Sequence, residues 1–454
     1  MTGSKPRTPA SSDAKAEANK ASIDAVAADP PATGKAKAYA AYVLFVLILA
    51  NMLSSIDRSI VNILVEPIRA DLGFSDTQMG AIGGLGFALF YGLLGLPIAR
   101  LADKYSRKRI LAVGMVVWSA MTMLTGRAVG FWTMLIPRIG VGAGEATLYP
   151  TGLSLIGDYF ARHNRPRAIG LFQVGVHLGI IVGAAIAGVV AEKHGWRHAF
   201  FLLGAPGLIL ALVLMVTVRE PERGRLDRVV GKPPLTDTFA TMAGLLTGNR
   251  PLLLLVLGSA LMSVAAATLA NWGAAYLIRS HGLTLSQVGL TVGPVLGLGG
   301  AIGTVVGGFV GSWVAKRSSD PYAPLKVILW TALPAAPFMT LFLMAPTMPL
   351  VVVGGLCGGL LTAMHYGPLV AVAIGLAPAA HRAMAGALMI LGQTVLGFGF
   401  GPLIAGGLSD LLAPGLGTEA LRYAMLIAPA SVVGAWICAG LARRMLIKSS
   451  PDTV

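Results

Sequence analysis

The stretch Arg138-Ile-Gly-Val-Gly-Ala-Gly-Glu145 carries two opposite charges inside an otherwise apolar run. The charged ends are two helical turns apart, so in a helix both side chains point to nearly the same face, about 10 Å from each other. An ionised group in a membrane helix costs several kcal/mol unless it faces a partner or water. Arg138 and Glu145 are therefore candidate functional residues, and the glycines between them favour close packing against a neighbouring helix.

A second charged pair, Asp57-Arg58, interrupts the apolar run Tyr42 to Val65 in the same way. The simplest interpretation is that the two helices share one polar cavity, which indicates a membrane transporter. A carboxylate beside an arginine can exchange its counter-ion for a proton as such a cavity opens and closes, because burial and the arginine act on its proton affinity in opposite senses.

We therefore expect proton coupling at Asp57 and Glu145. Arg58 and Arg138 either pair with these carboxylates or hold an anionic group of the substrate through bidentate hydrogen bonds. The alternative is a static network of buried salt bridges that fixes helix packing. Four charges in two helices are more than packing requires, and burying charge alone seldom adds stability.

The composition places most of the chain in lipid. Of 454 residues, 55% are hydrophobic and 12% charged, and the mean hydropathy is +0.74, well outside the range of soluble domains. The net charge of +15 comes from short basic segments between apolar runs and forms no nucleic-acid-binding module, so we expect no nucleic-acid partner. Cys357 and Cys438 lie in apolar stretches without metal-ligand spacing. The sequence therefore indicates no disulfide, no metal site and no cofactor.

Apolar runs of about 18 residues or more predict twelve transmembrane helices, in an all-α membrane protein of two pseudo-symmetric six-helix bundles. The predicted regions are a disordered cytoplasmic tail over 1–38, an N-terminal bundle over 39–218, a cytoplasmic linker over 219–250, a C-terminal bundle over 251–446 and a cytoplasmic tail over 447–454. The predicted spans lie near 40–68, 78–102, 108–126, 131–159, 166–191, 197–218, 251–279, 286–315, 322–345, 348–377, 383–412 and 418–446.

Loop charges set the expected orientation, because lysine and arginine gather on the cytoplasmic side. The loops at Lys104 to Arg109 and Arg162 to Arg167, the linker, and the loop around Lys316-Arg317 are basic and fall on one side. Both termini are therefore predicted to be cytoplasmic. The short loops favour a multi-pass protein of a bacterial inner membrane.

The two halves also echo each other in sequence. Ser75-Asp-Thr-Gln-Met-Gly80 opens the second span, and Thr284-Leu-Ser-Gln-Val-Gly289 opens the eighth, 209 residues later. Paired repeats of this kind allow secondary transporters to build a central site between two rocking halves.

Twelve spans with a basic loop after the second resemble the major facilitator superfamily. The segment Ala99-Arg-Leu-Ala-Asp103-Lys-Tyr-Ser-Arg107-Lys108-Arg109 looks like its cytoplasmic signature Gly-x-x-x-Asp-Arg/Lys-x-Gly-Arg-Arg/Lys, with Ala99 and Ser106 in place of glycines. In the family this segment latches the outward-open state. The resemblance therefore implies gating roles for Asp103, Arg107 and Lys108, together with Asp158 and Arg162 at the end of the fourth span. The simpler alternative is that the basic residues only set topology.

Within the superfamily, Asp57-Arg58 combined with Arg138-x-x-x-Gly-x-Gly-Glu145-Ala resembles the spinster-type transporters. Ala270-Asn-Trp-Gly-Ala-Ala-Tyr-Leu-Ile-Arg-Ser-His-Gly282 in the seventh span adds to this resemblance. Organic anion:proton symporters share the charges of the first and fourth spans, but Gly-x-Gly-Glu-Ala favours spinster.

Other polar residues at membrane depth are weaker candidates for substrate binding, because a lone polar residue there more often makes an interhelical hydrogen bond. His365-Tyr366 precedes Gly367-Pro368, where a helix can break and expose main-chain groups. Asn271 and Trp272 come partly from the resemblance. The complete weaker set is Gln173, His177, Asn271, Trp272, His365, Tyr366 and Gln393.

These features predict a monomeric, proton-linked carrier of spinster type that moves an amphipathic or lysolipid-like anion through the lipid bilayer. The alternative is a proton symporter for small organic acids such as sugar acids or aromatic carboxylates. We expect no enzyme and no catalytic residues, because neither a Ser/His/Asp arrangement nor a His-rich metal cluster is evident. A nucleotide-binding Gly-x-x-x-x-Gly-Lys-Ser/Thr loop is absent too, which argues against a primary pump.

Overall fold

A computed structural model describes residues 34–448, apart from 162–163, 223–237 and 379–380. Every regular element within these residues is a helix. The first half contains α2 (Gly34–Ile63), α3 (Val65–Leu72), α4 (Asp76–Gly80), η1 (Ala81–Leu85), α5 (Gly86–Lys104), α6 (Arg107–Thr125), α7 (Phe131–Glu145), α8 (Leu148–Tyr159), α9 (Arg165–His194) and α10 (Trp196–Thr217). The second half contains α11 (Thr238–Gly248), α12 (Arg250–His281), α13 (Leu285–Lys316), α14 (Leu325–Met344), α15 (Met348–Ala363), α16 (Tyr366–Gly375), α17 (Arg382–Leu391), η3 (Gly392–Gly399), α18 (Phe400–Leu416), η4 (Gly417–Glu419), α19 (Ala420–Ala424) and α20 (Ile427–Lys448).

Eleven helical stretches of the described chain, some made of consecutive elements such as α15 with α16, are long and apolar enough to cross a membrane. The predicted fourth span is divided into α7 and α8, which individually are shorter than a bilayer crossing, and together they complete twelve spans. The ends of the described helices differ from the predicted regions by a few residues. Helix α2 begins at Gly34, five residues before the predicted start at 39, and α20 ends at Lys448, two residues after the predicted end at 446. The predicted linker contains helix α11.

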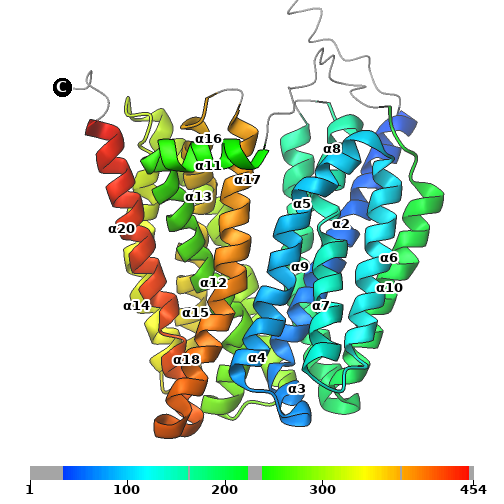
Figure 1. Ribbon diagram of the computed structural model, residues 1–454, viewed down its shortest axis with the longest axis vertical. Helices are drawn as coiled ribbons and strands as arrows, with labels where there is room; N and C mark the ends of the chain where they lie inside the picture. The colour runs from blue at the N-terminus through cyan, green and yellow to red at the C-terminus, as the bar shows by residue number, and fades with distance from the viewer. Residues whose placement is uncertain (1–33, 162–163, 223–237, 379–380, 449–454) are drawn as a thin grey trace, which may run out of the picture.

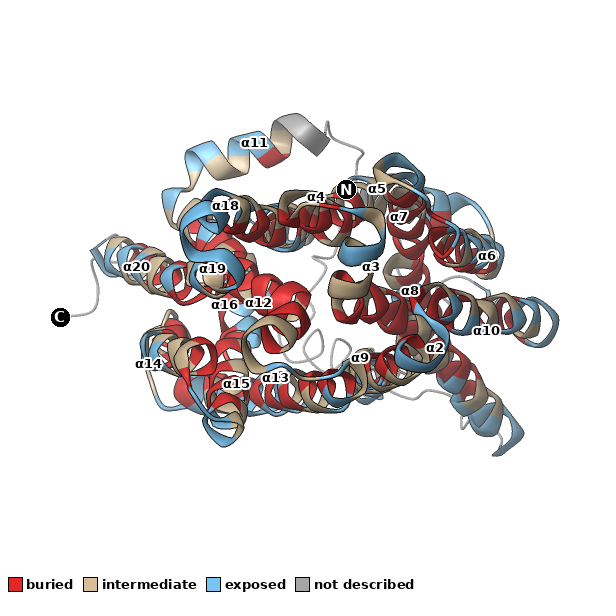
Figure 2. Cartoon of the chain, turned by 90° about the horizontal axis from the view of Figure 1, so that it is seen from below, coloured by how far each residue is buried: buried red, intermediate tan, exposed pale blue. Residues whose placement is uncertain are grey.

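The two halves lie side by side and approach each other most closely at the end away from the linker, which is the lower end in Figure 1. We call this the outer end and the opposite one the linker end. Seen from below, the two halves form two groups of helices, with α9 next to α13 along one edge and α4 next to α18 along the other (Figure 2). The element pairs α9–α13 and α4–α18 are in direct contact.

Glycines allow these helices to touch along their main chains. A Cβ atom at Gly179 of α9 would lie 2.3 Å from the Met52 carbonyl oxygen of α2. At the contact between halves, a Cβ atom at Gly188 of α9 would lie 2.4 Å from the Leu285 carbonyl oxygen. Small residues permit this close approach where lipid gives helices no hydrophobic reason to associate.

Candidate functional site

The first helix and the broken fourth span bring an arginine and a glutamate together inside the first half. Arg58 Nε of α2 lies 3.5 Å from Glu145 Oε2 at the end of α7. The Ser54 hydroxyl donates a hydrogen bond to the same carboxylate oxygen at 2.7 Å, and Arg58 Nη2 donates to the Ser54 hydroxyl at 3.2 Å. The side chain of Glu145 is fully buried, whereas that of Arg58 is 32% exposed.

Asp57 and Arg138 lie deeper, and their contact involves the main chain. Arg138 Nη1 donates a hydrogen bond to the carbonyl oxygen of Asp57 at 3.3 Å, and both residues are buried. All four predicted charges are therefore neighbours, but only Arg58 is substantially exposed. The ion pair of the site is formed by Arg58 and Glu145.

Three of these buried charges retain an atom without a hydrogen-bond partner among the described residues: Asp57 Oδ1, Arg138 Nε and Glu145 Oε1. Buried polar atoms are normally paired, and an unpaired one costs free energy. Such atoms are suited to exchanging partners when a proton or an anion enters the site.

An aromatic platform lies beneath the two guanidinium groups. The Phe87 ring centroid is 5.7 Å from Arg58 Cζ and 5.9 Å from Arg138 Cζ, within cation–π range. Tyr91 stacks on Phe87 with ring centroids 5.3 Å apart. This platform was not predicted, because a phenylalanine and a tyrosine in an apolar helix give no sign in the sequence of the charge they face.

Two tyrosines lie close to the guanidinium of Arg58: Tyr91 of α5 and Tyr149 of α8. The Tyr149 hydroxyl donates a hydrogen bond of 2.7 Å to Gln173 Oε1 of α9, which places the predicted residue Gln173 next to the charged site. The position of Tyr149, one helical turn beyond Glu145, is the one sequence signal that could have identified it.

The remaining predicted substrate-binding residues lie in different surroundings. His177 is partly buried and one turn from Gln173. Asn271 is buried and donates to Asn62 Oδ1 of the first half at 3.0 Å, and Trp272 is buried with its indole N–H bonded to the Pro402 carbonyl oxygen. The last three are His365, bonded through Nδ1 to the Thr362 carbonyl oxygen, Tyr366, which is 42% exposed, and Gln393, bonded to the Ser259 hydroxyl.

The two halves are joined at the outer end by an arginine for which the sequence predicted no role. Arg279 of α12 donates hydrogen bonds to Glu66 Oε1 at 2.7 and 2.5 Å, and to both oxygens of Asp76 at 2.7 Å. Its side chain is 11% exposed. Two carboxylates of the first half are thus clamped by one guanidinium of the second half.

At the linker end, the predicted gating residues form contacts within the first half. Arg107 pairs with Asp158 and lies 2.8 Å from Glu220. Lys108 Nζ donates to the carbonyl oxygens of Met215 and Val218, at and just beyond the end of α10. Asp103 is exposed at the end of α5, and Arg162 lies outside the described residues.

Glu220 was not predicted, yet it organises the start of α6. Its carboxylate accepts hydrogen bonds from the Ser106 hydroxyl at 2.7 Å and from the Lys108 main-chain N–H at 2.9 Å. Burial raises the pKa of Glu220, but the hydrogen bonds from Lys108, Arg107 and Ser106 outweigh burial, and the pKa lies below its ordinary value. The carboxylate is therefore ionised at neutral pH and bonded to the N-terminus of α6.

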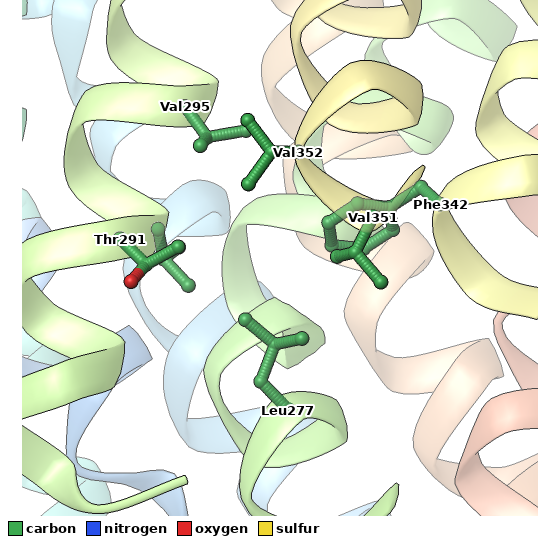
Figure 3. Close-up of a pocket in the computed structure, with 7 residues that line it drawn as sticks. Leu277, Thr291, Val295, Phe342, Val351 and Val352 are labelled. Carbon is green, nitrogen blue, oxygen red and sulfur yellow. The ribbon is translucent and has the colours of Figure 1, made fainter. Parts of the chain in front are cut away.

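A small pocket at the outer end of the second half is apolar and lies apart from the charged site. Figure 3 shows aliphatic side chains and Phe342 around it, with the hydroxyl of Thr291 as its polar group. Such a lining offers no charge to an anion. The described residues also contain no group of three or more histidine, cysteine or acidic side chains that could hold a metal ion. The lining residues are Leu277, Thr291, Val292, Val295, Phe342, Val351 and Val352.

Residues 47–332 match the family model of the Major Facilitator Superfamily. An MFS-type efflux pump of Mycolicibacterium smegmatis is 30% identical over 92% of this chain and 96% of its own length. A probable L-galactonate transporter of Escherichia coli (strain K12) is 29% identical over 63% of this chain and 64% of its length. The crystal structure of a bacterial homologue of the human lysosomal transporter spinster, inward-facing and unoccupied, matches 94% of this chain and all of that chain, with a TM-score of 0.80 and 27% identity.

The matches to the efflux pump and to the spinster homologue cover more than nine tenths of the chain, and they agree with an all-helical fold whose charges lie inside a helix bundle. The chain therefore belongs to the Major Facilitator Superfamily, as a spinster-like transporter.

Proposed function

We propose that this protein is a proton-coupled secondary transporter that moves an amphipathic anionic substrate by alternating access. The observation that carries the proposal is the unequal exposure of one ion pair. Glu145 is fully buried, whereas its partner Arg58 is 32% exposed. An anion can therefore reach the guanidinium without first reaching the carboxylate.

The coupling follows from charge balance. An anionic group that binds Arg58 through charge-assisted hydrogen bonds competes with Glu145 for the same cation. Glu145 then stays buried without its counter-ion, a state that costs several kcal/mol. Taking up a proton removes that cost, so substrate and proton bind together. Asp57, next to Arg138, is the second candidate for the proton.

The proposal also includes the orientation of the protein in the membrane and its inward-facing conformation. Basic loops on the linker side favour cytoplasmic termini, so the outer end faces away from the cytoplasm. Contacts such as Arg279 with Glu66 and Asp76 hold the outer end closed. The described conformation is thus inward-facing, which the similarity to an inward-facing spinster homologue supports.

An amphipathic cargo suits the uneven distribution of charge between the halves. All four charges of the site lie in the first half, and the second-half residues predicted to bind substrate, such as Gln393 and Tyr366, are uncharged. The polar head would meet Arg58, and the apolar part would lie against the second half. A small organic acid is the second candidate, favoured by the hydroxyls of Tyr91 and Tyr149 beside Arg58 and by the L-galactonate transporter among the relatives.

A ligand-stabilisation screen separates the two substrate classes, because a ligand that binds the folded state raises the melting temperature by mass action. The purified protein is screened against lysolipids, sphingoid phosphates, sugar acids and aromatic carboxylates. We expect stabilisation by the amphipathic anions, which disappears in Arg58→Gln. Stabilisation by sugar acids alone would establish the second candidate.

Proton coupling is tested with the stabilising compound in proteoliposomes. We expect Glu145→Gln to exchange substrate across the membrane but to lose accumulation driven by a pH gradient, because the glutamine cannot take up the proton. Glu419→Gln, at an ion pair with Arg422 far along the chain, serves as the control and keeps both activities. Undiminished proton-driven accumulation in Glu145→Gln would remove this residue from the coupling.

A further inference from the structure

Two helices begin at the outer end with the same local structure. In α4 the Ser75 hydroxyl accepts from the Gln78 N–H, and the Gln78 side chain accepts from the Ser75 N–H. In α13 Thr284 and Gln287 form the same reciprocal pair. These capping boxes satisfy part of the helix start and leave other main-chain N–H groups free for further acceptors.

Each of these helix starts also donates hydrogen bonds to a carboxylate from the opposite half. Asp410 of α18 accepts from the Asp76 N–H at 3.0 Å, the Thr77 N–H at 2.8 Å and the Thr77 hydroxyl at 2.5 Å. Glu192, in the last turn of α9, accepts from the Ser286 N–H at 2.7 Å. The first half thus caps a helix of the second half, and the second half caps a helix of the first.

The two caps occupy matching places in the repeat. Helix α9 is the fifth span and α18 ends the eleventh, while α4 starts the second and α13 the eighth. Asp410 follows Glu192 by 218 residues, which is close to the 209 residues between Ser75 and Thr284. The caps are therefore related by the pseudo-symmetry of the halves.

We infer that the outer face closes through these two exchanged helix caps, and that Asp410 and Glu192 set the equilibrium between the outwardly closed and outwardly open states. A carboxylate at a helix N-terminus is stabilised by the free N–H groups and by the positive end of the helix dipole. Because each carboxylate and its helix belong to different halves, both bonds break when the outer ends separate. Helix α4 is short, but it continues through η1 and α5 as one span.

The inference rests on the alternating access proposed above, so its test measures the distance between the halves and not transport. Spin labels are placed at the exposed outer positions Val129 and Thr347, in a variant with both native cysteines changed to serine. Pulsed dipolar spectroscopy in nanodiscs then gives the distance distribution. Asp410→Ala should lower the ratio of short-distance to long-distance molecules by roughly three- to tenfold. Glu192→Ala should lower it less, because its carboxylate is exposed, and the double variant should show the largest change.

Asp71→Ala is the matched control, because Asp71 is also an outer carboxylate but pairs with Arg197 inside the first half. It should leave the distribution unchanged. Asp410→Asn keeps the size of the side chain and guards against a folding artefact; it should shift the ratio in the same direction as Asp410→Ala. An unchanged distribution in the double variant would overturn the inference. If the distance distribution shifts but the protein moves no protons, the inference about the caps stands and the proposed proton coupling is refuted.

Discussion

Arg58 and Glu145 show what residue spacing in a sequence can and cannot predict. Each interrupts an apolar helix, and the free energy cost of an unpaired charge in lipid predicts that they meet; they lie 3.5 Å apart. The bond from Arg138 to the main-chain carbonyl of Asp57 was not foreseen. Main-chain acceptors are present at every position, so no sequence pattern marks the one that an arginine selects.

Glu220 gives a prediction about pH at the linker end. Its lowered pKa means that the folded state binds this proton more weakly than the unfolded chain. The resulting stability is complete above the ordinary glutamate pKa of about 4.3 and is lost as the pH falls through the lower pKa of the folded state. Glu220→Gln should therefore melt about 1–3 °C below the unmodified protein at pH 7, and the difference should shrink below about pH 4.

The exposed Glu222, two residues further on, provides the control. Glu222→Gln should have the same melting temperature as the unmodified protein at every pH. A difference for Glu220→Gln that stayed constant down to pH 3 would mean that the carboxylate does not hold the start of α6 in its ionised form.

Each half contains a broken helix that carries polar residues of its central part. Helix α7 ends at Glu145 and α8 begins at Leu148, while α15 ends at Ala363 and α16 begins at Tyr366. The sequence predicted the second break from Gly367-Pro368. It did not predict the first, although Pro150 follows that break as Pro368 follows the second. Hydropathy cannot show such a break, because both fragments remain apolar.

Substitutions of two glycines in α9 test whether its close packing on α2 stabilises the first half. A Cβ atom at Gly179 would lie 2.3 Å from the Met52 carbonyl oxygen, whereas one at Gly170 in the same helix would meet no atom within 4 Å. Gly179→Ala should destabilise the protein by about 1–3 kcal/mol, as overpacking does. Gly170→Ala should be neutral or stabilising by up to about 1 kcal/mol, because alanine favours the helix.

Thermal unfolding in detergent measures both variants, and each is the control for the other. Equal melting temperatures for Gly179→Ala and Gly170→Ala would show that α9 can move away from α2 at little cost. In that case the glycines would reflect a loose contact and not the close packing described here.

Twelve spans and a division into halves were predictable from hydropathy and the repeated helix starts. The contacts that join the halves at the outer end were not predictable, because they depend on side chains that meet across the halves. Arg279 is 213 residues from Glu66 in the chain, and neither residue alone indicates the other. Pairing at such a separation is decided by tertiary packing, so a single sequence leaves it open.

Whether the described state is inward-facing or outward-facing depends on how the molecule is oriented in the membrane. Loop charge is the physical basis of that orientation. Val129, between α6 and α7, is exposed at the outer end, and Ser319, between α13 and α14, is exposed at the linker end. With both native cysteines changed to serine, a membrane-impermeant maleimide should label Val129→Cys in intact cells. It should label Ser319→Cys only after permeabilisation. The reverse pattern would make the closed end cytoplasmic and the described state outward-facing, so that the substrate would meet Arg58 from the opposite side of the membrane.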